Sequence, residues 1–459
     1  MVDLGTIQGG SSSANAVSAD GAVVVGEAGF GVPVGGARLT HAFRWTSSTG
    51  MVDLGTLAGG FSSSALGVSS NGAVVVGRAD KANADRAFRW TKTTGMQTVE
   101  DWLRNSGIPI ANDITRAATA TNNDGSVVVG VLANNHAFIA RVAGAAGAAG
   151  GLVTLAEVQE SLNAATVGGG MALTAANTVI NGAHSRPLAR RVQSGKNAFW
   201  IAGDWGRDDH GSRDGDLGLA ELGLAHNFGE VQANVSLGQT WANQNLVLSG
   251  SVKADGSYLL TEALMRLSDN LWATLGGYGQ WGKADLRRGY MNAGSQDTST
   301  GRPEVDAWGL RARLDWDSAY VLADASLTPY ADLVYSKSRM NGYTETGGGF
   351  PAHFDARKDI ATELRLGINV LKPLGSGLNL LGTLEVAHRF EKDTARISGQ
   401  VTGLFRFDIA GEKVERDWLR LGMGAEGKLA GGTASLLLNV TSRGEAPNAW
   451  LAASWQTAF

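Results

Sequence analysis

From Asn197 to the end of the chain, apolar and polar residues alternate with a period of two. In AWGLRARLDW, Trp308, Leu310 and Leu314 share one face, and the opposite face carries Arg311 and Arg313. The same alternation recurs in IATELRLGINVL, LLGTLEVAHRFE and DWLRLGMGAEG. Such segments predict β-strands with one apolar and one polar face. Counting them gives about twelve antiparallel strands between residues 196 and 459.

The expected connections between these strands alternate in length. Short ones fall at 228–230, at 268–270, around Asp317, at 373–377 and at 430–432. Long polar ones fall at 207–216, 244–254, 288–303, 341–357, 393–414 and 443–447. Tryptophans gather near strand ends, as in interfacial girdles: Trp200, Trp205, Trp241, Trp272, Trp281, Trp308, Trp316 and Trp455. Outer-membrane barrels combine these features, with short periplasmic turns and longer extracellular loops. We therefore predict an all-β chain with a twelve-stranded transmembrane barrel.

The polar faces of the strands are expected to line the barrel lumen. Their charged members are Glu221, Arg311, Arg313, Glu363, Arg365, Glu385, Arg389, Arg420 and Glu426. These side chains can pair with one another across a wet lumen, or they can grip a chain segment that passes through it. Both roles stay open.

Residues 155–195 carry the first helical composition in the chain, rich in Ala, Leu, Glu and Gln. We expect helix at 155–165 and 171–183, with an interruption near Gly168 and an end before Pro187. About 20 helical residues span a hydrocarbon core. This segment is therefore long enough to thread the barrel.

Residues 1–142 form a repeat array. SADGAVVVGEA, SSNGAVVVGRA and NNDGSVVVGVL align, and the spacings from Asp20 to Asn71 and from Asn71 to Asp124 are 51 and 53 residues. Asp-Gly and Asn-Gly favour type I′ turns, and the valine runs favour strands. Each copy predicts a β-meander that is suited to an incomplete propeller ring or a short stack. We expect residues 143–154, which begin AGAAGAAGG, to be a flexible Ala/Gly linker.

The repeats resemble the HAF family of extracellular repeats, through His41-Ala42-Phe43 and His136-Ala137-Phe138. In the middle copy Arg86 replaces the histidine. We interpret both histidines as packing residues rather than ligands. MVDLGT at residues 1–6 recurs at 51–56, so we expect that further repeats and a signal precede this sequence.

Residues 155–459 resemble type Va autotransporters, through HSRPLARRVQSGKNAFWIAGDWG, NGYTETGG and the aromatic C-terminus. The resemblance implies a Gram-negative outer-membrane barrel that exports an N-terminal passenger. It also implies contacts with lipid, periplasmic chaperones and the barrel-assembly machinery, and a monomeric barrel. Leu451, Ala453, Trp455 and Phe459 fit the terminal assembly signal, although Thr457 stands where the family often has an aromatic residue.

Some members of that family cleave their linker at an Asn inside the barrel. The candidates here are Asn177 and Asn181, but this part of the chain has no Asn-Asn pair, so we do not favour self-cleavage.

Composition excludes several kinds of chemistry. The chain has 459 residues, a net charge of −4 and no Cys, so there is no Cys-ligated metal site and no basic footprint for nucleic acid. No nucleotide-binding, esterase-type or zinc-protease motif occurs. Asp208, Asp209, Asp214 and Asp216 could hold Ca²⁺, but we favour a solvated loop because arginines interleave with them.

We therefore predict an outer-membrane translocator that needs no cofactor, binds no metal and is not an enzyme. The alternatives are a hydrolase or adhesin whose active part lies in the passenger, and a soluble two-domain β-protein that serves in binding.

Overall fold

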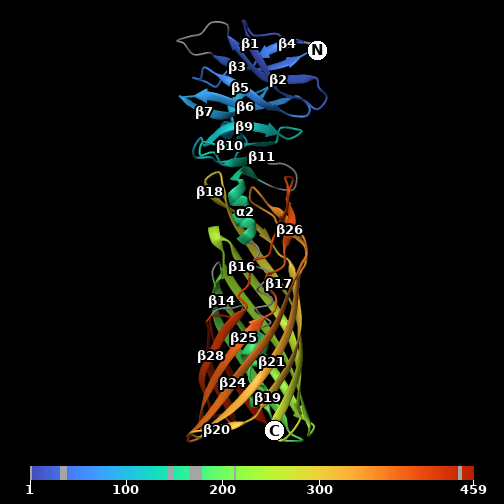
Figure 1. Ribbon diagram of the computed structural model, residues 1–459, viewed down its shortest axis with the longest axis vertical. Coiled ribbons are helices and arrows are strands. Elements are labelled where there is room, and N and C mark those ends of the chain that lie inside the picture. The colour runs from blue at the N-terminus through green and yellow to red at the C-terminus, as the bar shows by residue number, and fades with distance from the viewer. Residues whose placement is uncertain (1–2, 31–38, 143–148, 165–177, 211–212, 443–446) are drawn as a thin grey trace.

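The computed structural model describes residues 3–30, 39–142, 149–164, 178–210, 213–442 and 447–459. Three small sheets are stacked on one end of a long β-barrel (Figure 1). This end of the barrel is its mouth, and both the C-terminus and the short turns lie at the opposite end. Helix α2 (Leu155–Ala164) lies between the third small sheet and the barrel.

Within the described residues, twelve long antiparallel strands form the barrel. They are β13 (Asn197–His210), β14 (Arg213–Asn227), β15 (Val231–Asn245), β16 (Ser251–Arg266), β17 (Leu271–Asn292), β19 (Glu304–Trp316), β21 (Ala325–Met340), β24 (Arg357–Gly375), β25 (Leu378–Arg389), β28 (Asp417–Leu429), β29 (Gly432–Thr441) and β30 (Ala449–Ala458). The last strand closes on the first, with Ala198 opposite Ala458 and Arg207 opposite Ala449. The predicted twelve-stranded barrel is confirmed.

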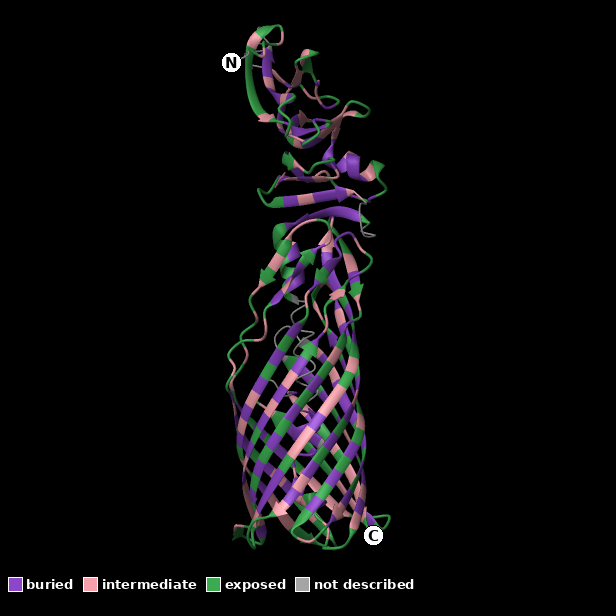
Figure 2. Cartoon of the chain, turned by 90° about the vertical axis from the view of Figure 1, so that its right-hand side faces the viewer, coloured by how far each residue is buried: buried purple, intermediate pink, exposed green. Residues whose placement is uncertain are grey.

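The polarity of the barrel is inverted relative to a soluble protein. Along β19, Trp308, Leu310 and Leu314 are exposed, whereas Arg311 and Arg313 are buried in the lumen. Figure 2 shows this alternation of exposed and buried residues along the barrel strands. An apolar outer face and a polar interior suit a barrel surrounded by hydrocarbon.

Two tryptophans do not join the expected girdles. Trp200 and Trp272 are buried in the lumen, whereas Trp205, Trp281 and Trp308 are exposed on the outside. The reason is register, because successive side chains of a strand point to opposite faces. A tryptophan near a strand end can therefore point either to the outside or into the lumen.

Most of the expected long loops continue as paired strands. They form β18 (Ser295–Gly301), which extends the barrel sheet, and a separate small sheet of β22 (Tyr343–Thr344), β23 (Ala352–Phe354), β26 (Ile397–Val401) and β27 (Arg406–Ile409). The short strand β20 (Tyr320–Leu322) pairs with β21 at the other end. The loop expected at 207–216 is the hairpin of β13 and β14. In these segments the backbone groups bond one another across paired strands.

Aromatic rings in the lumen lie over glycines of the neighbouring strand. The pairs are Trp200 and Gly223, Tyr258 and Gly238, Tyr278 and Gly309, and Tyr330 and Gly367. A Cβ added at any of these glycines would come within 2.5 Å of the ring. The missing side chain therefore makes room for the ring beside the wall.

Each of the three repeats forms a four-stranded antiparallel sheet. Their strands are β1 (Gly9–Val17), β2 (Val23–Phe30), β3 (Thr40–Thr46) and β4 (Gly50–Asp53); β5 (Ser63–Val68), β6 (Val74–Lys81), β7 (Ala84–Thr91) and β8 (Gly95–Thr98); and β9 (Thr115–Thr121), β10 (Val127–Leu132), β11 (Ala137–Val142) and β12 (Gly150–Thr154). The sheets form a short stack, with helix α1 (Val99–Asn105) after the second sheet.

The valine runs follow from this stacking. In the middle sheet Val74 and Val76 pack in the core that includes the third sheet, whereas Val75 packs in the core that includes the first. Val24, in the first sheet, is only half-buried. A sheet covered on both faces needs a continuous apolar run rather than an alternating one.

The repeat turns are not of type I′. In the described chain only the glycine of each pair has a positive φ, 73° at Gly21, 69° at Gly72 and 73° at Gly125. The preceding Asp or Asn instead acts as an acceptor, and Asp20 receives bonds from the Ser18 hydroxyl and the Ala22 N–H. These bonds lower the pKa of Asp20. The side chain therefore closes a longer loop, in which the residue before glycine keeps a negative φ.

The helices of the described residues are all too short or too polar to cross a membrane.

The lumen pairs predict that, of two glycine substitutions close together in the barrel, one destabilises it and the other does not. In Gly309→Ala, the new Cβ would lie 2.4 Å from the Tyr278 ring and 2.7 Å from the Tyr335 carbonyl oxygen. Such overpacking costs about 1–3 kcal/mol. In Gly279→Ala, the new Cβ would meet nothing within 4 Å. Heat-modifiable mobility on SDS gels should show a lower barrel-unfolding temperature only for Gly309→Ala, and equal temperatures for the two variants would contradict this packing.

Candidate functional site

The lumen is occupied by the chain that precedes the first barrel strand. Residues 178–190 include a π-helix, η2 (Val179–Ala183), and a 3₁₀ turn, η3 (Pro187–Arg190). Val179 and Ile180 are buried against apolar residues of the wall, among them Tyr258 and Tyr278. Residues 178–190, the lumen segment, are thus packed into the barrel interior.

The expected helices are only partly found in the lumen. Helix α2 corresponds to the first of them and lies at the mouth. Residues 171–177 of the second lie outside the described residues, and the chain from Thr178 is helical with a widened last turn. Asn177 also lies outside the described residues, whereas Asn181 is buried within η2.

Glu221 of β14 joins the lumen segment to the wall. Its carboxylate contacts His184 Nε2 at 2.9 Å and accepts from Arg190 Nη1 at 2.9 Å. It also accepts from the Trp200 indole and the Tyr258 hydroxyl, each at 2.8 Å. All five residues are buried. One wall carboxylate therefore binds two groups of the lumen segment and two of the wall.

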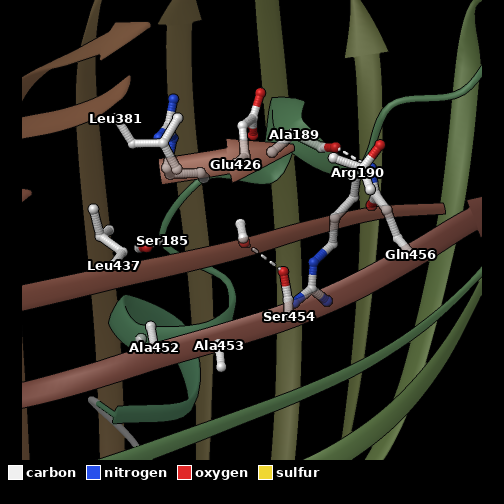
Figure 3. A pocket seen from close by; sticks show the side chains of 14 residues that line it. Ser185, Ala189, Arg190, Leu381, Glu426, Leu437, Ala452, Ala453, Ser454 and Gln456 are labelled. Carbon is white, nitrogen blue, oxygen red and sulfur yellow. Dashed lines mark hydrogen bonds between the residues drawn. The ribbon is translucent and has the colours of Figure 1, made fainter. Parts of the chain in front are cut away.

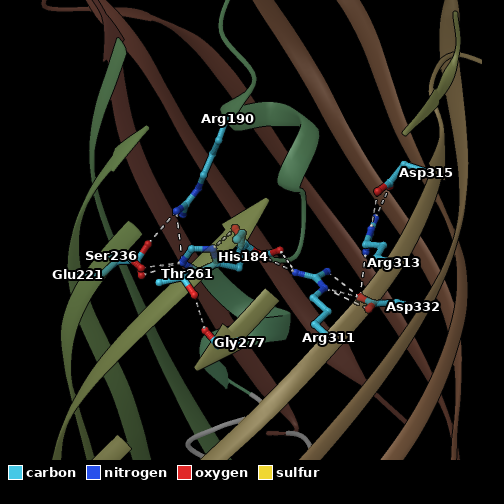
Figure 4. Close-up of polar contacts among 11 residues, drawn as sticks. His184, Arg190, Glu221, Ser236, Thr261, Gly277, Arg311, Arg313, Asp315 and Asp332 are labelled. Carbon is cyan, nitrogen blue, oxygen red and sulfur yellow. Dashed lines mark hydrogen bonds and ion pairs between the residues drawn. The ribbon is translucent and has the colours of Figure 1, made fainter. Parts of the chain in front are cut away.

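His184 also contacts a second carboxylate. Its Nδ1 lies 3.0 Å from Glu262, and its backbone carbonyl accepts from Arg311 Nη1 at 2.8 Å. Arg311 in turn binds Asp332 of β21 (Figure 4). With a carboxylate at each ring nitrogen, the imidazole has an acceptor within hydrogen-bond distance of both Nδ1 and Nε2. We call His184, Arg190, Glu221, Glu262 and Arg311 the lumen network.

A second group of charges joins only wall strands. Arg313 binds Asp315 at 2.7 Å, and Arg365 binds Glu363 and, at 3.0 Å, Glu385. Such internal pairing is needed because an unpaired charge in a buried site is costly.

The structure places all nine sequence-predicted lumen charges inside the barrel. Arg389 bonds the Ile360 carbonyl at 3.1 Å, Arg420 bonds Asn439 at 2.8 Å, and Glu426 accepts from Asn379 at 3.0 Å. Of the nine, Glu221 and Arg311 belong to the lumen network.

Several residues of this site are not among the lumen residues expected from the sequence, including His184, Arg190 and Glu262. Glu262 shares its strand face with Leu260 and Leu264, so the alternation of YLLTEALMR does not mark that face as polar. His184 and Arg190 lie in an irregular stretch with no period to assign them to a face.

The lumen segment leaves space on the opposite side of the barrel. A pocket between it and β28–β30 is lined by Ser185, Arg186 and Ser454, among others (Figure 3). A neighbouring cavity of about 340 Å³ shares Arg186 and Glu426 with this pocket. The segment therefore does not fill the barrel, although Gln456 of β30 donates to the Ala189 carbonyl at 2.6 Å.

The mouth is closed by α2. The helix begins with a capping box, in which Thr154 N bonds Glu157 at 2.7 Å and Glu157 N bonds Thr154 at 3.1 Å. Val158 and Leu162 pack with Phe350 in an apolar cluster at the mouth.

Two arginines fix this closure. Arg288 of β17 binds Glu345 at 2.7 Å and the Ser161 hydroxyl of α2 at 2.8 Å. Arg141 of the third small sheet donates to the carbonyls of Gly349 and Thr402. Burial lowers the pKa of Arg141 to about 10. The last repeat is thus bonded directly to the barrel loops.

The predicted assembly-signal residues lie at the closing seam. Leu451, Ala453 and Phe459 are exposed on the outside, and Trp455 is half-buried. Phe459 exchanges backbone hydrogen bonds of 3.0 Å with Asn197 in both directions. The intervening residues Ser454 and Gln456 point into the lumen.

The acidic residues 208–216 belong to the β13–β14 hairpin. Asp208 is buried, the Asp209 N–H bonds Asn448, and Asp214 and Asp216 pair with Arg207. Among the described residues, no cluster of His, Asp or Glu is arranged to hold a metal ion.

Comparisons with known proteins agree with this architecture. The family model described as Autotransporter beta-domain matches residues 199–441, more than half of the chain. The structure is similar to the translocator domain of autotransporter NalP from Neisseria meningitidis, with 16% identity, a TM-score of 0.51, and 64% of this chain and 99% of that chain covered. It also matches the β domain of the Bordetella autotransporter Brka, with 18% identity, a TM-score of 0.42, and 57% and 100% covered.

A curated relative is the "Uncharacterized protein in trpE-trpG intergenic region" of Pseudomonas putida, 24% identical over 150 residues. The match covers 32% of this chain, and the chain spans about a quarter of the length of that relative.

The lumen network predicts that Glu221→Leu releases the lumen segment. Leaving buried His184 and Arg190 without this carboxylate costs about 3–5 kcal/mol. The chain has no Cys, so a Ser185→Cys substitution supplies a single thiol. Its labelling rate reports how readily a water-soluble reagent reaches the lumen segment. Labelling by a water-soluble maleimide should be faster in Glu221→Leu.

Glu385→Leu is the matched control, because Glu385 bonds Tyr330 and Arg365 of the wall. It should destabilise the barrel and leave the labelling rate unchanged. Equal acceleration in both variants would contradict a separate role for Glu221.

Proposed function

Since this chain belongs to the autotransporter beta-domain family, we propose that its barrel exports the chain's own N-terminal repeats and displays them on the cell surface. Domains of this family reside in the outer membrane as translocators. We also propose that the secretion is of type Va and that the passenger repeats are of the HAF class.

The path of the chain carries this proposal. The repeats lie beyond the mouth, whereas β13 begins at the opposite end, beside the C-terminus. The buried lumen segment precedes β13. A chain whose described residues lie at the mouth (155–164) and in the lumen (178–190), before a first strand that begins at the far end, fits export through the barrel.

Export by this route needs an energy source other than nucleotide hydrolysis, since no nucleotide-binding motif occurs in the sequence. Folding of the repeats outside can supply it. Each small sheet buries valines against its neighbour, and burial stabilises by roughly 25 cal/mol per Å² of apolar surface. A folded repeat that resists return through the barrel would make outward movement directional.

The proposed partners follow from the surface of the barrel. Its outer face meets lipid, its terminal strand is presented to the barrel-assembly machinery, and periplasmic chaperones hold the chain before assembly. We propose a monomeric barrel that binds no nucleic acid and needs no cofactor. Catalysis is not part of the translocator role, and a hydrolase or adhesin activity would belong to the passenger.

Surface display predicts that protease added outside intact cells cleaves one part of the protein and spares the other. Proteinase K added to intact cells should degrade the repeats and leave the barrel of residues 196–459 protected, because the repeats lie outside the membrane whereas the barrel strands are embedded in it and its outer loops are paired. Immunoblots with antibodies against each part provide the measurement. Protection of the repeats in intact cells, with degradation after lysis, would place them in the periplasm and contradict the proposal.

Charged substitutions in the terminal strand should impair assembly when they lie on its outer face, but not when they lie on its lumen face. Replacing both Trp455 and Phe459 with Asp places charges on the outer face at the closing seam, at a cost of up to about 1 kcal/mol each near the end of the barrel. The heat-modifiable barrel and the surface repeats should decrease together in outer-membrane fractions. Ser454→Asp, on the lumen side of the same strand, is the control and should assemble. Normal levels of the double variant would exclude a signal at these residues.

A further inference from the structure

The contacts between neighbouring small sheets repeat along the stack. Arg44 of the first sheet donates through Nε to the Gly72 carbonyl of the second at 3.2 Å. Arg89 of the second sheet donates in the same way to the Gly125 carbonyl of the third at 3.1 Å. Each of these sheets therefore gives an arginine from its third strand to the turn glycine of the sheet that follows.

The same joints share an apolar contact. A Cβ added at Gly72 would lie 2.4 Å from Val23, and one added at Gly125 would lie 2.3 Å from Val74. Both glycines are buried. Each sheet thus has a donor side, with a valine and an arginine, and an acceptor side, with a glycine turn that leaves room for the valine and offers a carbonyl to the arginine.

The donor side of the third sheet is altered. Ile139 occupies the position of Arg44 and Arg89 in the aligned repeats, and it packs against the cluster at the barrel mouth. Arg141, two residues later, binds the barrel loops. The stack therefore ends on the barrel at this side.

The acceptor side of the first sheet is uncovered. Gly21 aligns with Gly72, yet it is exposed, and a Cβ added there would meet nothing within 4 Å. Ala14 is also exposed, although its equivalent in the second sheet, Ala65, is completely buried. The exposed fraction of the Val17 side chain is 58%. These positions are covered in the second sheet because the first sheet lies on it.

We propose that this face of the first sheet is a docking surface for one further repeat of the same class, stacked in cis as the first sheet is stacked on the second. The added repeat places a valine over Gly21 and donates an arginine N–H to the Gly21 carbonyl. This goes beyond the export function and does not depend on it. The stack is a modular array that is open to extension at the end far from the barrel.

The repeating contacts select this occupant over others. The face offers a carbonyl at a turn without a side chain, next to a small residue, which is the surface that the second and third sheets offer to their neighbours. Sequential repeats are also adjacent in space, as expected for a stacked array. A second copy of the chain is disfavoured, because in the described residues the donor sides of its three sheets face the second sheet, the third sheet and the barrel.

The test is the full chain with an extra copy of residues 1–50 placed before Met1. Residues 51–56 repeat residues 1–6, so the new junction reproduces the natural junction between Gly50 and Met51. A single Val17→Cys substitution in the original first repeat supplies the only thiol. Its labelling by maleimide should become about threefold slower when the extra copy is present, because docking covers part of the side chain, as the first sheet covers part of Val68 in the second.

Two controls separate docking from a general effect. A Ser48→Cys thiol should label at the same rate with and without the extra copy, because Thr93, its equivalent in the middle sheet, stays exposed. Arg44→Ala in the extra copy should restore fast labelling at position 17, at least in part, since it removes the donor to Gly21.

An unchanged labelling rate at position 17 would overturn the proposal. Protease sensitivity of the extra copy would also overturn it, because a repeat that docks on this face should be folded and resist proteolysis. In the parent chain, without the extra copy, labelling at position 17 that slows as the protein concentration rises would overturn it as well. That result would indicate that a second molecule covers this face.

Discussion

The structure depends on the need to pair every backbone N–H and C=O group that lies in hydrocarbon, where each unpaired group costs several kcal/mol. This need is met by closure of β13 on β30 and of Asn197 on Phe459. Closure creates an interior that lipid cannot reach and brings the start of the first strand to the C-terminus. The repeats lie at the other end, and the chain that connects them passes into the lumen.

A closed interior imposes a second requirement, because buried charges need partners. Wall strands satisfy part of this requirement among themselves, as at Arg365 and Glu385. Glu221 instead receives His184 and Arg190 from the lumen segment. The segment that is proposed to remain after export is therefore part of the barrel's electrostatic structure. The aromatic rings that lie over glycines, such as Tyr258 over Gly238, leave it room.

The alternation of the sequence was sufficient to predict the barrel, because period-two patterning reports which face meets lipid. Arg311 and Glu363, whose phase is fixed by neighbours on both sides, are buried in the structure. It failed for Trp200, which was assigned by position in the strand instead of by face. The lumen network could not be predicted, because His184 comes from irregular backbone and its partners lie 37 and 78 residues away in sequence.

The central claim is that residues 178–190 lie in the barrel lumen of the assembled protein. Its most direct test is a photo-crosslinking amino acid placed at Ala189 in living cells. Ala189 is exposed to the lumen space, and its carbonyl accepts from Gln456 at 2.6 Å. Mass spectrometry should find crosslinks to β28–β30, centred near Gln456, within the same chain. Crosslinks to lipid or to periplasmic proteins, with none to the barrel wall, would contradict the account.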